Sequence, residues 1–143
     1  MLKGIIAIHG HRPFAAPLEA AHRLATRIDS TQHWLAQPNW SSGSVHSGIR
    51  YLEPDARTVG QALAKHPGGG GAAAELRTLG GVFTKVGRQL DNAARSRGPM
   101  DLSAADRTAF AQKLAQPLAD GQRLVAYAKG VLQQTLDGAA QLH

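Results

Sequence analysis

The residues of this chain best suited to metal binding or acid–base catalysis are its seven histidines, and their spacing supports neither chemistry. His9 and His11 alternate near the start of the chain, and His22 falls in a stretch of helical periodicity. A zinc hydrolase would need a His-Glu-x-x-His pair on one helix face, and a di-iron bundle would need carboxylate-rich helices. The chain also contains no cysteine, which excludes thiolate catalysis, disulfides and iron–sulfur clusters. We therefore predict no bound metal.

Motifs for nucleophilic catalysis and for phosphate cradling are also missing. The segment Ile5 to Gly10 resembles a strand and His-Gly turn of an α/β-hydrolase, but no Gly-x-Ser-x-Gly pentapeptide occurs in the chain. The run Gly68 to Gly71 is not followed by Gly-Lys-Ser or Gly-Lys-Thr, so it lacks the lysine and magnesium ligand of a P-loop. We predict a protein that is not an enzyme and holds no organic cofactor.

The charge of the chain favours anionic partners. Sixteen lysines and arginines stand against ten acidic residues, which gives a formal net charge of +6 and a pI near 10.3. Eleven of the sixteen cations are arginine, whose planar guanidinium binds phosphate with two parallel hydrogen bonds. The longest apolar run, Ile5 to Ile8, is far shorter than the roughly 20 residues that span a bilayer. Any membrane contact is therefore expected to be peripheral.

The elements that must position these cations are predicted to be helices. Apolar residues recur at helical spacing from Pro17 to Ala36, and again from Pro54 to just before His66. The clearest seam uses steps of three and four residues: Leu76, Leu79, Phe83, Val86, Leu90 and Ala93. Residues 37–48 show no helical period and predict a long loop.

A last helix is predicted to begin with a capping box formed by Ser103 and Asp106. Its apolar face comprises Phe110, Leu114, Leu118, Val125, Ala128, Leu132, Leu136 and Ala139, and Pro117 and Gly121 predict a kink or a break within it.

These elements predict an all-α protein, an antiparallel four-helix bundle with an N-terminal extended arm. Residues 1–16 form the arm and residues 17–143 form the bundle, which we expect to be one domain of a longer protein. In such a bundle the loops after the first and third helices lie at the same end.

That end gathers aromatic, apolar and basic residues from two loops, which we call the predicted tip. Trp and Tyr favour a membrane–water boundary, and each nearby cation is worth about 1 kcal/mol at an anionic surface. Burial of one or two apolar side chains would add roughly 1.5 to 3 kcal/mol each. We predict that the tip binds lipid through Trp40, Arg50, Tyr51, Leu52, Arg95, Arg97 and Met100.

A basic, aromatic tip on a four-helix bundle resembles the membrane-localisation domains of bacterial toxins and type III secretion effectors, including the lipid-raft-targeting domain of a Bordetella cytotoxic effector. The resemblance covers Pro17 to Leu142 and is architectural. It implies a virulence protein that is secreted into a host cell and docks on the inner face of the plasma membrane through acidic phospholipids or phosphoinositides. The matching positions are Arg50, Tyr51, Leu52, Arg95 and Arg97.

Two other classes of function stay open. One is a helical protein-interaction module, for example a segment that a secretion chaperone wraps through Met1 to Phe14 and the first helix. The other is a basic nucleic-acid-associated protein, for which Arg88, Arg95 and Arg97 could mark a surface. The apolar face of the predicted third helix forms the core seam, so we do not expect this helix to read bases in a DNA groove. The remaining helix arginines are expected on solvated faces: Arg23, Arg27, Arg57, Arg77 and Arg123.

Overall fold

The computed structural model describes residues 2–96 and 102–141, and every regular element within these ranges is an α-helix. The prediction of an all-α protein is therefore confirmed. The helices are α1 (Leu2–Leu35), α2 (Ser42–Arg50), α3 (Leu52–Ala64), α4 (Gly70–Ser96) and α5 (Ala104–Gln141).

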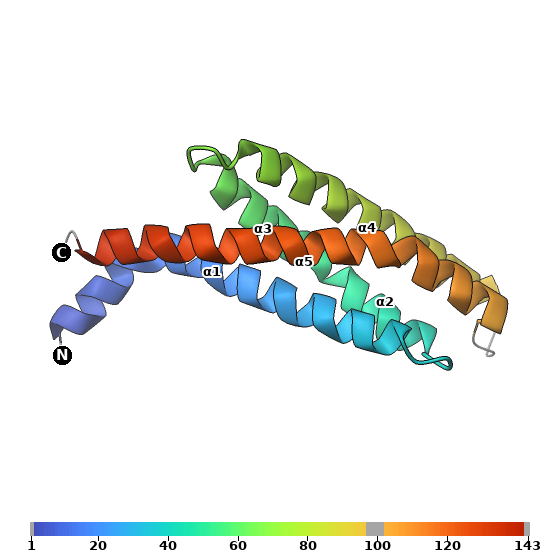
Figure 1. The fold of residues 1–143 in the computed structure, drawn as a ribbon. Helices are drawn as coiled ribbons and strands as arrows, with labels where there is room; N and C mark the ends of the chain where they lie inside the picture. Colours follow the sequence, from blue (N-terminus) through green and yellow to red (C-terminus); the bar gives the residue numbers. More distant parts are fainter. Residues whose placement is uncertain (1, 97–101, 142–143) are drawn as a thin grey trace.

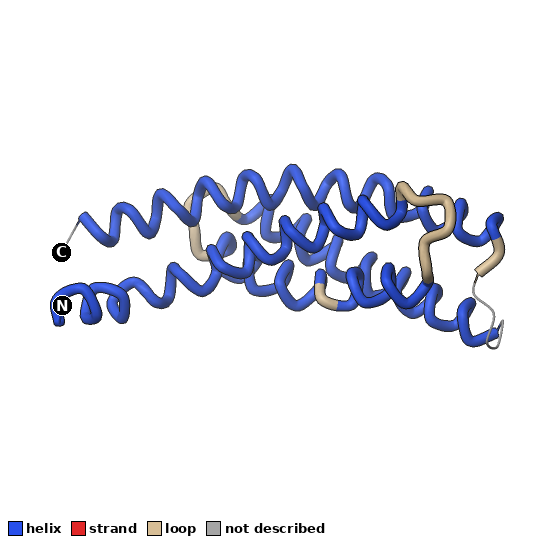
Figure 2. The backbone as a smooth tube through the Cα atoms, turned by 90° about the horizontal axis from the view of Figure 1, so that it is seen from below, coloured by secondary structure: helices blue, strands red, loops and turns tan. Residues whose placement is uncertain are grey.

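The helices lie lengthwise beside one another (Figure 1). α1 packs along α5, α3 packs along α4, and α2 contacts both α1 and α4. Figure 1 shows α2 and α3 following each other along one line, so the two short helices together form one rod. α1 and α4 run away from the end at which α1 begins, and α3 and α5 run back toward it. Figure 2 shows the loop between α1 and α2 at the same end as the start of α5.

The predicted seam of α4 faces the core. Leu76, Leu79, Phe83, Val86 and Leu90 are all buried, and Ala93 packs against them half-buried. Burial of these side chains is the main source of helix stability, because isolated helices of this composition are marginal in water. The predicted apolar face of α5 is also buried from Phe110 to Leu132.

The N-terminal segment differs from the prediction. An extended arm was expected over residues 1–16, whereas Leu2 to Ala16 is the first part of the long helix α1. An extended segment leaves its backbone N–H and C=O groups without partners unless another strand lies beside it, and a helix satisfies them internally. The described chain offers no strand to pair with.

The long loop predicted for residues 37–48 was wrong for residues 42–48, and the break that was one of two alternatives predicted at Pro117 and Gly121 was also wrong. Residues 42–48 belong to α2 and not to a long loop, because Val45 and Ile49 are one helical turn apart and both bury completely. Ser41 caps this helix by accepting a hydrogen bond from the Ser44 N–H at 3.1 Å. α5 also runs through Pro117 without a break, because Leu114 and Leu118 pack into the core on either side.

The turn between α3 and α4 depends on two of its glycines. Gly68 has a φ of 79°, a conformation that other residues adopt only with strain. A Cβ on Gly69 would overlap the carbonyl oxygen of Leu63. His66 in this turn shares a hydrogen bond with Thr135 of α5. The Gly-rich run is therefore a tight, anchored turn, and its last two glycines already belong to α4.

Candidate functional site

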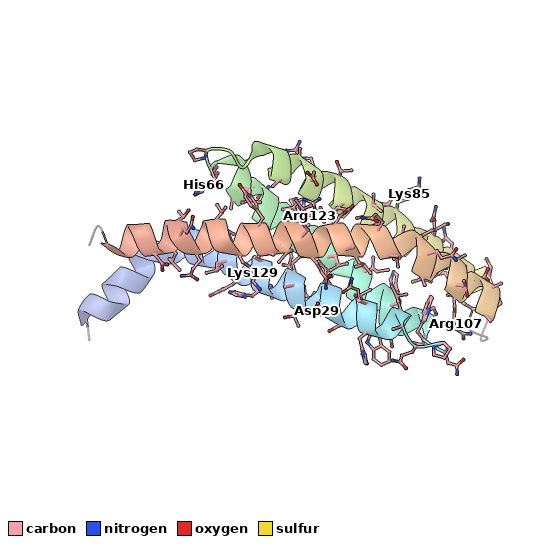
Figure 3. All side chains as sticks on the ribbon, in the orientation of Figure 1. Asp29, His66, Lys85, Arg107, Arg123 and Lys129 are labelled. Atoms are coloured by element: carbon pink, nitrogen blue, oxygen red, sulfur yellow. The ribbon has the colours of Figure 1, made fainter. Side chains whose placement is uncertain are left out.

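The end of the molecule predicted to bind lipid is held together by a contact between loop and helix. Arg107, near the start of α5, donates a hydrogen bond from Nε to the carbonyl oxygen of Trp40 at 2.9 Å. Figure 3 shows Arg107 at the end where the α1–α2 loop lies. Ser103 caps α5 by accepting a hydrogen bond from the Asp106 N–H at 3.1 Å, as the capping-box prediction required of the serine.

Two of the predicted lipid-binding residues are core residues. Trp40 is only 2% exposed and Leu52 is fully buried. Both fold inward because a large apolar side chain gains more from contacts with the neighbouring helices than from water. Neither side chain is available for shallow insertion into a membrane, so their assignment to a lipid-binding surface is corrected.

The other described residues of the predicted tip, Arg50, Tyr51 and Arg95, come from two separate places in the fold. Arg95 is exposed at the end of α4 and forms an ion pair with Asp91 at 3.1 Å. Arg97 and Met100 lie outside the described residues. Arg50 and Tyr51 lie at the junction of α2 and α3, where the ring of Tyr51 contacts Arg27 of α1.

Tyr51 is the centre of a cluster of cations on the side of the bundle. Its ring is 45% exposed. The guanidinium carbon of Arg27 lies 4.8 Å from the ring centroid, and that of Arg50 lies 5.6 Å from it. Both distances are within the range of cation–π attraction. Tyr51 therefore holds two arginines from different helices close to one exposed aromatic ring.

Asp55 fixes the α1 side of this cluster. The carboxylate is 6% exposed and accepts hydrogen bonds from Arg23 at 3.2 Å and from Arg27 at 2.7 Å. A carboxylate this deeply buried needs a charged partner, and two guanidiniums supply it. Asp55 belongs to α3 and both arginines belong to α1, so the three residues tie these helices together.

Trp34 extends the same surface toward the end of α1. Arg23, Arg27 and Trp34 are four and seven residues apart, a spacing that places them on one side of the helix. Trp34 is 44% exposed, and within residues 16–96 and 102–138 it is one of three large apolar side chains with substantial exposure. We name this surface the basic–aromatic face: Arg23, Arg27, Trp34, Arg50 and Tyr51.

The sequence-based prediction included Arg50 and Tyr51 in the predicted tip but missed the residues that lie beside them. Arg23 and Arg27 were assigned to a solvated helix face, and Asp55 was not singled out. Arg23 and Arg27 lie 32 and 28 residues from Asp55 along the chain, so only the packing of α1 on α3 reveals the contact. The four-residue spacing of the two arginines was the one signal available.

Arg123 of α5 shows what an ordinary surface pair looks like in this molecule. Its guanidinium lies 2.9 Å from the Glu75 carboxylate of α4, and both side chains are more than half exposed. The hydrogen bond to Glu75 and the attraction of its charge raise the pKa of Arg123.

The described residues offer no metal centre and no membrane span. Among the side chains that the structure describes, those of residues 16–96 and 102–138, no three His, Asp or Glu gather closely enough to hold a metal ion. No helix in the same ranges combines the length and apolar character needed to cross a bilayer.

Comparison of the chain with family models, with curated proteins and with solved structures found no match. The resemblance to toxin and effector membrane-localisation domains therefore stays a prediction.

Proposed function

We propose that this chain is an antiparallel four-helix bundle that docks on anionic phospholipid surfaces, without catalysing a reaction, through the basic–aromatic face. The observation that carries the proposal is the position of Tyr51, half exposed between the guanidiniums of Arg27 and Arg50. The proposed lipid contact therefore lies on the side of the bundle, and not at the end where the sequence predicted it.

The chemistry of the face suits the headgroup region of a membrane. Tyr and Trp rings favour the boundary between headgroups and acyl chains, and Tyr51 and Trp34 both present part of their rings to solvent. The cluster contains the guanidiniums of Arg23, Arg27 and Arg50 and the carboxylate of Asp55, which leaves two net positive charges. Each net charge is worth about 1 kcal/mol near an anionic surface, so binding is weak and reversible.

The arrangement also explains why a paired arginine can still attract a phosphate. Asp55 occupies one edge of the guanidiniums of Arg23 and Arg27, whereas each guanidinium carries five N–H donors. The side chains of Arg23 and Arg27 are 51% and 35% exposed, so the remaining donors are accessible. Asp55 thus holds the donors in position and leaves most of them free for a phosphate oxygen.

Co-sedimentation with vesicles tests the proposal. The protein should sediment with phosphatidylcholine vesicles that contain phosphatidylserine or a phosphoinositide, and should stay in solution with phosphatidylcholine alone. The double variant Arg50→Gln/Tyr51→Ser should bind about ten-fold more weakly, since it loses one cation and one interfacial ring. Added salt should release the wild-type protein, because exposed charges act over a Debye length of about 8 Å at physiological ionic strength.

The chain offers a matched control in α5. Arg123→Gln/Tyr127→Ser removes the same two side-chain types, and Tyr127 is 43% exposed, similar to Tyr51. This variant should sediment like the wild-type protein. Equal loss in both double variants would mean that net charge alone drives binding, and unchanged sedimentation of Arg50→Gln/Tyr51→Ser would overturn the proposal.

We also propose delivery of the protein into a host cell, as a toxin or type III effector, and this part of the proposal rests on the architectural resemblance alone.

The alternative function, a protein-interaction module, makes a different prediction. A chaperone that wraps the first helix would be displaced by changes in α1 and not by Arg50→Gln/Tyr51→Ser, which a pull-down with the partner would distinguish.

A further inference from the structure

A second basic surface, a groove between α3 and α4, differs from the basic–aromatic face because no aromatic residue lines it. Two adjoining hollows of about 480 and 580 Å³ lie along the seam between α3 and α4. Both are lined by Glu53, Arg57 and Arg77, so together they form one continuous α3–α4 groove. Pockets of this size accommodate ligands, although a groove open along its length suits an extended ligand better than a compact one.

The floor of the α3–α4 groove is made of small residues. Ala56, Gly60, Ala73 and Gly80 contribute no bulky side chain, and all four are buried. A Cβ on Gly80 would lie 3.2 Å from Cγ of Glu53, so the two helices approach each other closely there. The groove therefore has a smooth base, and its properties depend on the side chains along its rims.

Those rims are strongly basic. Five cations line the groove against the single carboxylate of Glu53, which pairs with Arg57 at 3.2 Å. The side chains of the other four have no ion pair or hydrogen bond to residues 16–96 and 102–138, whose side chains the structure describes. Those four are Lys65, Arg77, Lys85 and Arg88.

The lack of an internal partner distinguishes these four cations from five arginines outside the groove. Each of those five contacts an acceptor within the protein: Arg23, Arg27, Arg95, Arg107 and Arg123. Figure 3 shows Lys85 projecting away from α4 and from the rest of the bundle. Among the described cations with no ion pair or hydrogen bond to the protein, four line the α3–α4 groove, where an external anion can reach them, and two, Arg50 and Lys129, lie elsewhere.

The cations form a row rather than a cluster. Arg77, Lys85 and Arg88 follow one exposed side of α4, and at 1.5 Å per residue the row from Arg77 to Arg88 is about 16 Å long. Lys65 continues the basic rim at the end of α3. A single phosphate could contact only part of this row. A linear polyanion with regularly spaced charges could contact all of it.

Uncharged donors lie between the cations. Gln61 and Asn92 line the groove with side chains that hydrogen-bond phosphate and sugar oxygens in protein–nucleic acid complexes. Thr84 also lines it, but its hydroxyl donates to the Gly80 carbonyl oxygen at 3.0 Å. No aromatic residue lines it, so there is no platform for stacking bases. The exposed rings of Trp34, Tyr51 and Tyr127 are not among its lining residues, and the groove offers no anchor for an acyl region.

From these observations we propose that the α3–α4 groove binds the phosphate backbone of nucleic acid, without sequence preference. Four unpaired cations can neutralise up to four phosphates. The logarithm of the binding constant should then fall against the logarithm of salt concentration with a slope of about −3.6 for duplex DNA, or about −2.8 for a single strand.

Fluorescence anisotropy with labelled oligonucleotides tests this proposal. Two unrelated sequences, each as single strand and duplex, are titrated with the full chain across a range of salt concentrations. Both sequences should bind equally well. The triple variant Arg77→Gln/Lys85→Gln/Arg88→Gln should bind far more weakly. Loss of three of the four phosphate contacts should also lower the magnitude of the salt slope by about 2.7 for duplex DNA, or by about 2.1 for a single strand.

A charge-matched variant on α5 separates the groove from net charge. Lys113→Gln/Arg123→Gln/Lys129→Gln removes three cations that do not line the groove and should bind nearly as well as the wild-type protein. Equal loss in the two triple variants would overturn the proposal, as would a groove variant that binds normally while retaining the wild-type thermal midpoint.

The proposal is also separable from lipid docking. The groove variant should still sediment with anionic vesicles, and Arg50→Gln/Tyr51→Ser should still bind oligonucleotides. If anionic vesicles instead displace the oligonucleotide and the groove variant fails to sediment, the groove is a membrane contact and the nucleic-acid proposal is wrong.

Discussion

Gly48 of α2 lies against Thr31 of α1 so closely that a Cβ on the glycine would be 2.6 Å from Thr31 Oγ1. The Thr31 side chain cannot easily move away, because the residue is 1% exposed and its hydroxyl donates to the Arg27 carbonyl oxygen at 2.7 Å. This contact sets the separation of α1 and α2. It thereby helps to place Arg27 of α1 beside Tyr51, at the end of α2.

We therefore expect Gly48→Ala to destabilise the protein by about 1 to 3 kcal/mol, as overpacking of a close contact does. Thr31→Ala removes the clashing oxygen, so the double variant should be more stable than the sum of the two single changes predicts. Gly130→Ala in α5 is the control. A Cβ there meets nothing within 4 Å, and the change should stabilise the helix by about 0.8 to 1.0 kcal/mol. Urea unfolding measures all four variants.

The two tryptophans should respond differently to lipid. Trp40 is 2% exposed and Trp34 is 44% exposed. In Trp40→Phe, where only Trp34 emits, anionic vesicles should shift the emission to the blue and protect it from acrylamide. In Trp34→Phe, the buried Trp40 should emit at short wavelength with or without vesicles. A vesicle-dependent shift confined to Trp40 would place the contact at the end of the bundle and not on the basic–aromatic face.

Phe83 should be one of the largest contributors to stability. Its ring is 1% exposed and lies 4.0 Å from the position of a Cβ built on Gly121 of α5. Phe83→Ala should lower the free energy of unfolding by about 3 to 5 kcal/mol, because truncation leaves a cavity between α4 and α5. Phe83→Leu should cost less. An unchanged melting midpoint in the alanine variant would contradict the packing of this seam.

The carboxylate of Asp55 should matter far more than that of its neighbour on α3. Asp55→Asn weakens two charge-assisted hydrogen bonds at a site that is 6% exposed, and should cost about 1.5 to 3 kcal/mol. Glu53→Gln removes the partner of Arg57, in a pair whose side chains are 31% and 61% exposed, and should cost about 0 to 1 kcal/mol. Equal losses in chemical denaturation would mean that the Asp55 contacts contribute nothing beyond a surface pair.

Helical class and most of the core could be read from the sequence, because helix periodicity is a local property. The three- and four-residue steps from Leu76 to Leu90 put those side chains on one side of any helix they form, and all are buried. Ser103 predicted the start of the last helix for the same reason, since a cap acts within one turn.

Prediction from local sequence failed where packing against a distant part of the chain outweighs the helix propensity of the residues. Ser and Gly residues made 42–48 look like a loop, but Val45 and Ile49 gain enough from burial against other helices to hold a helix there. Pro117 costs α5 a hydrogen bond, yet the packing of Leu114 and Leu118 keeps the helix continuous.

The sequence by itself determined the helical periodicity, the excess of arginine and the presence of an Arg50–Tyr51 pair. Only the tertiary structure decided that Trp40 is buried, that Arg23 and Arg27 converge on Asp55, and that four unpaired cations border one groove. The physical reason is range: periodicity and capping act within a few residues. Desolvation and ion pairing depend on which helix lies alongside, and in this bundle those neighbours are tens of residues away in the chain.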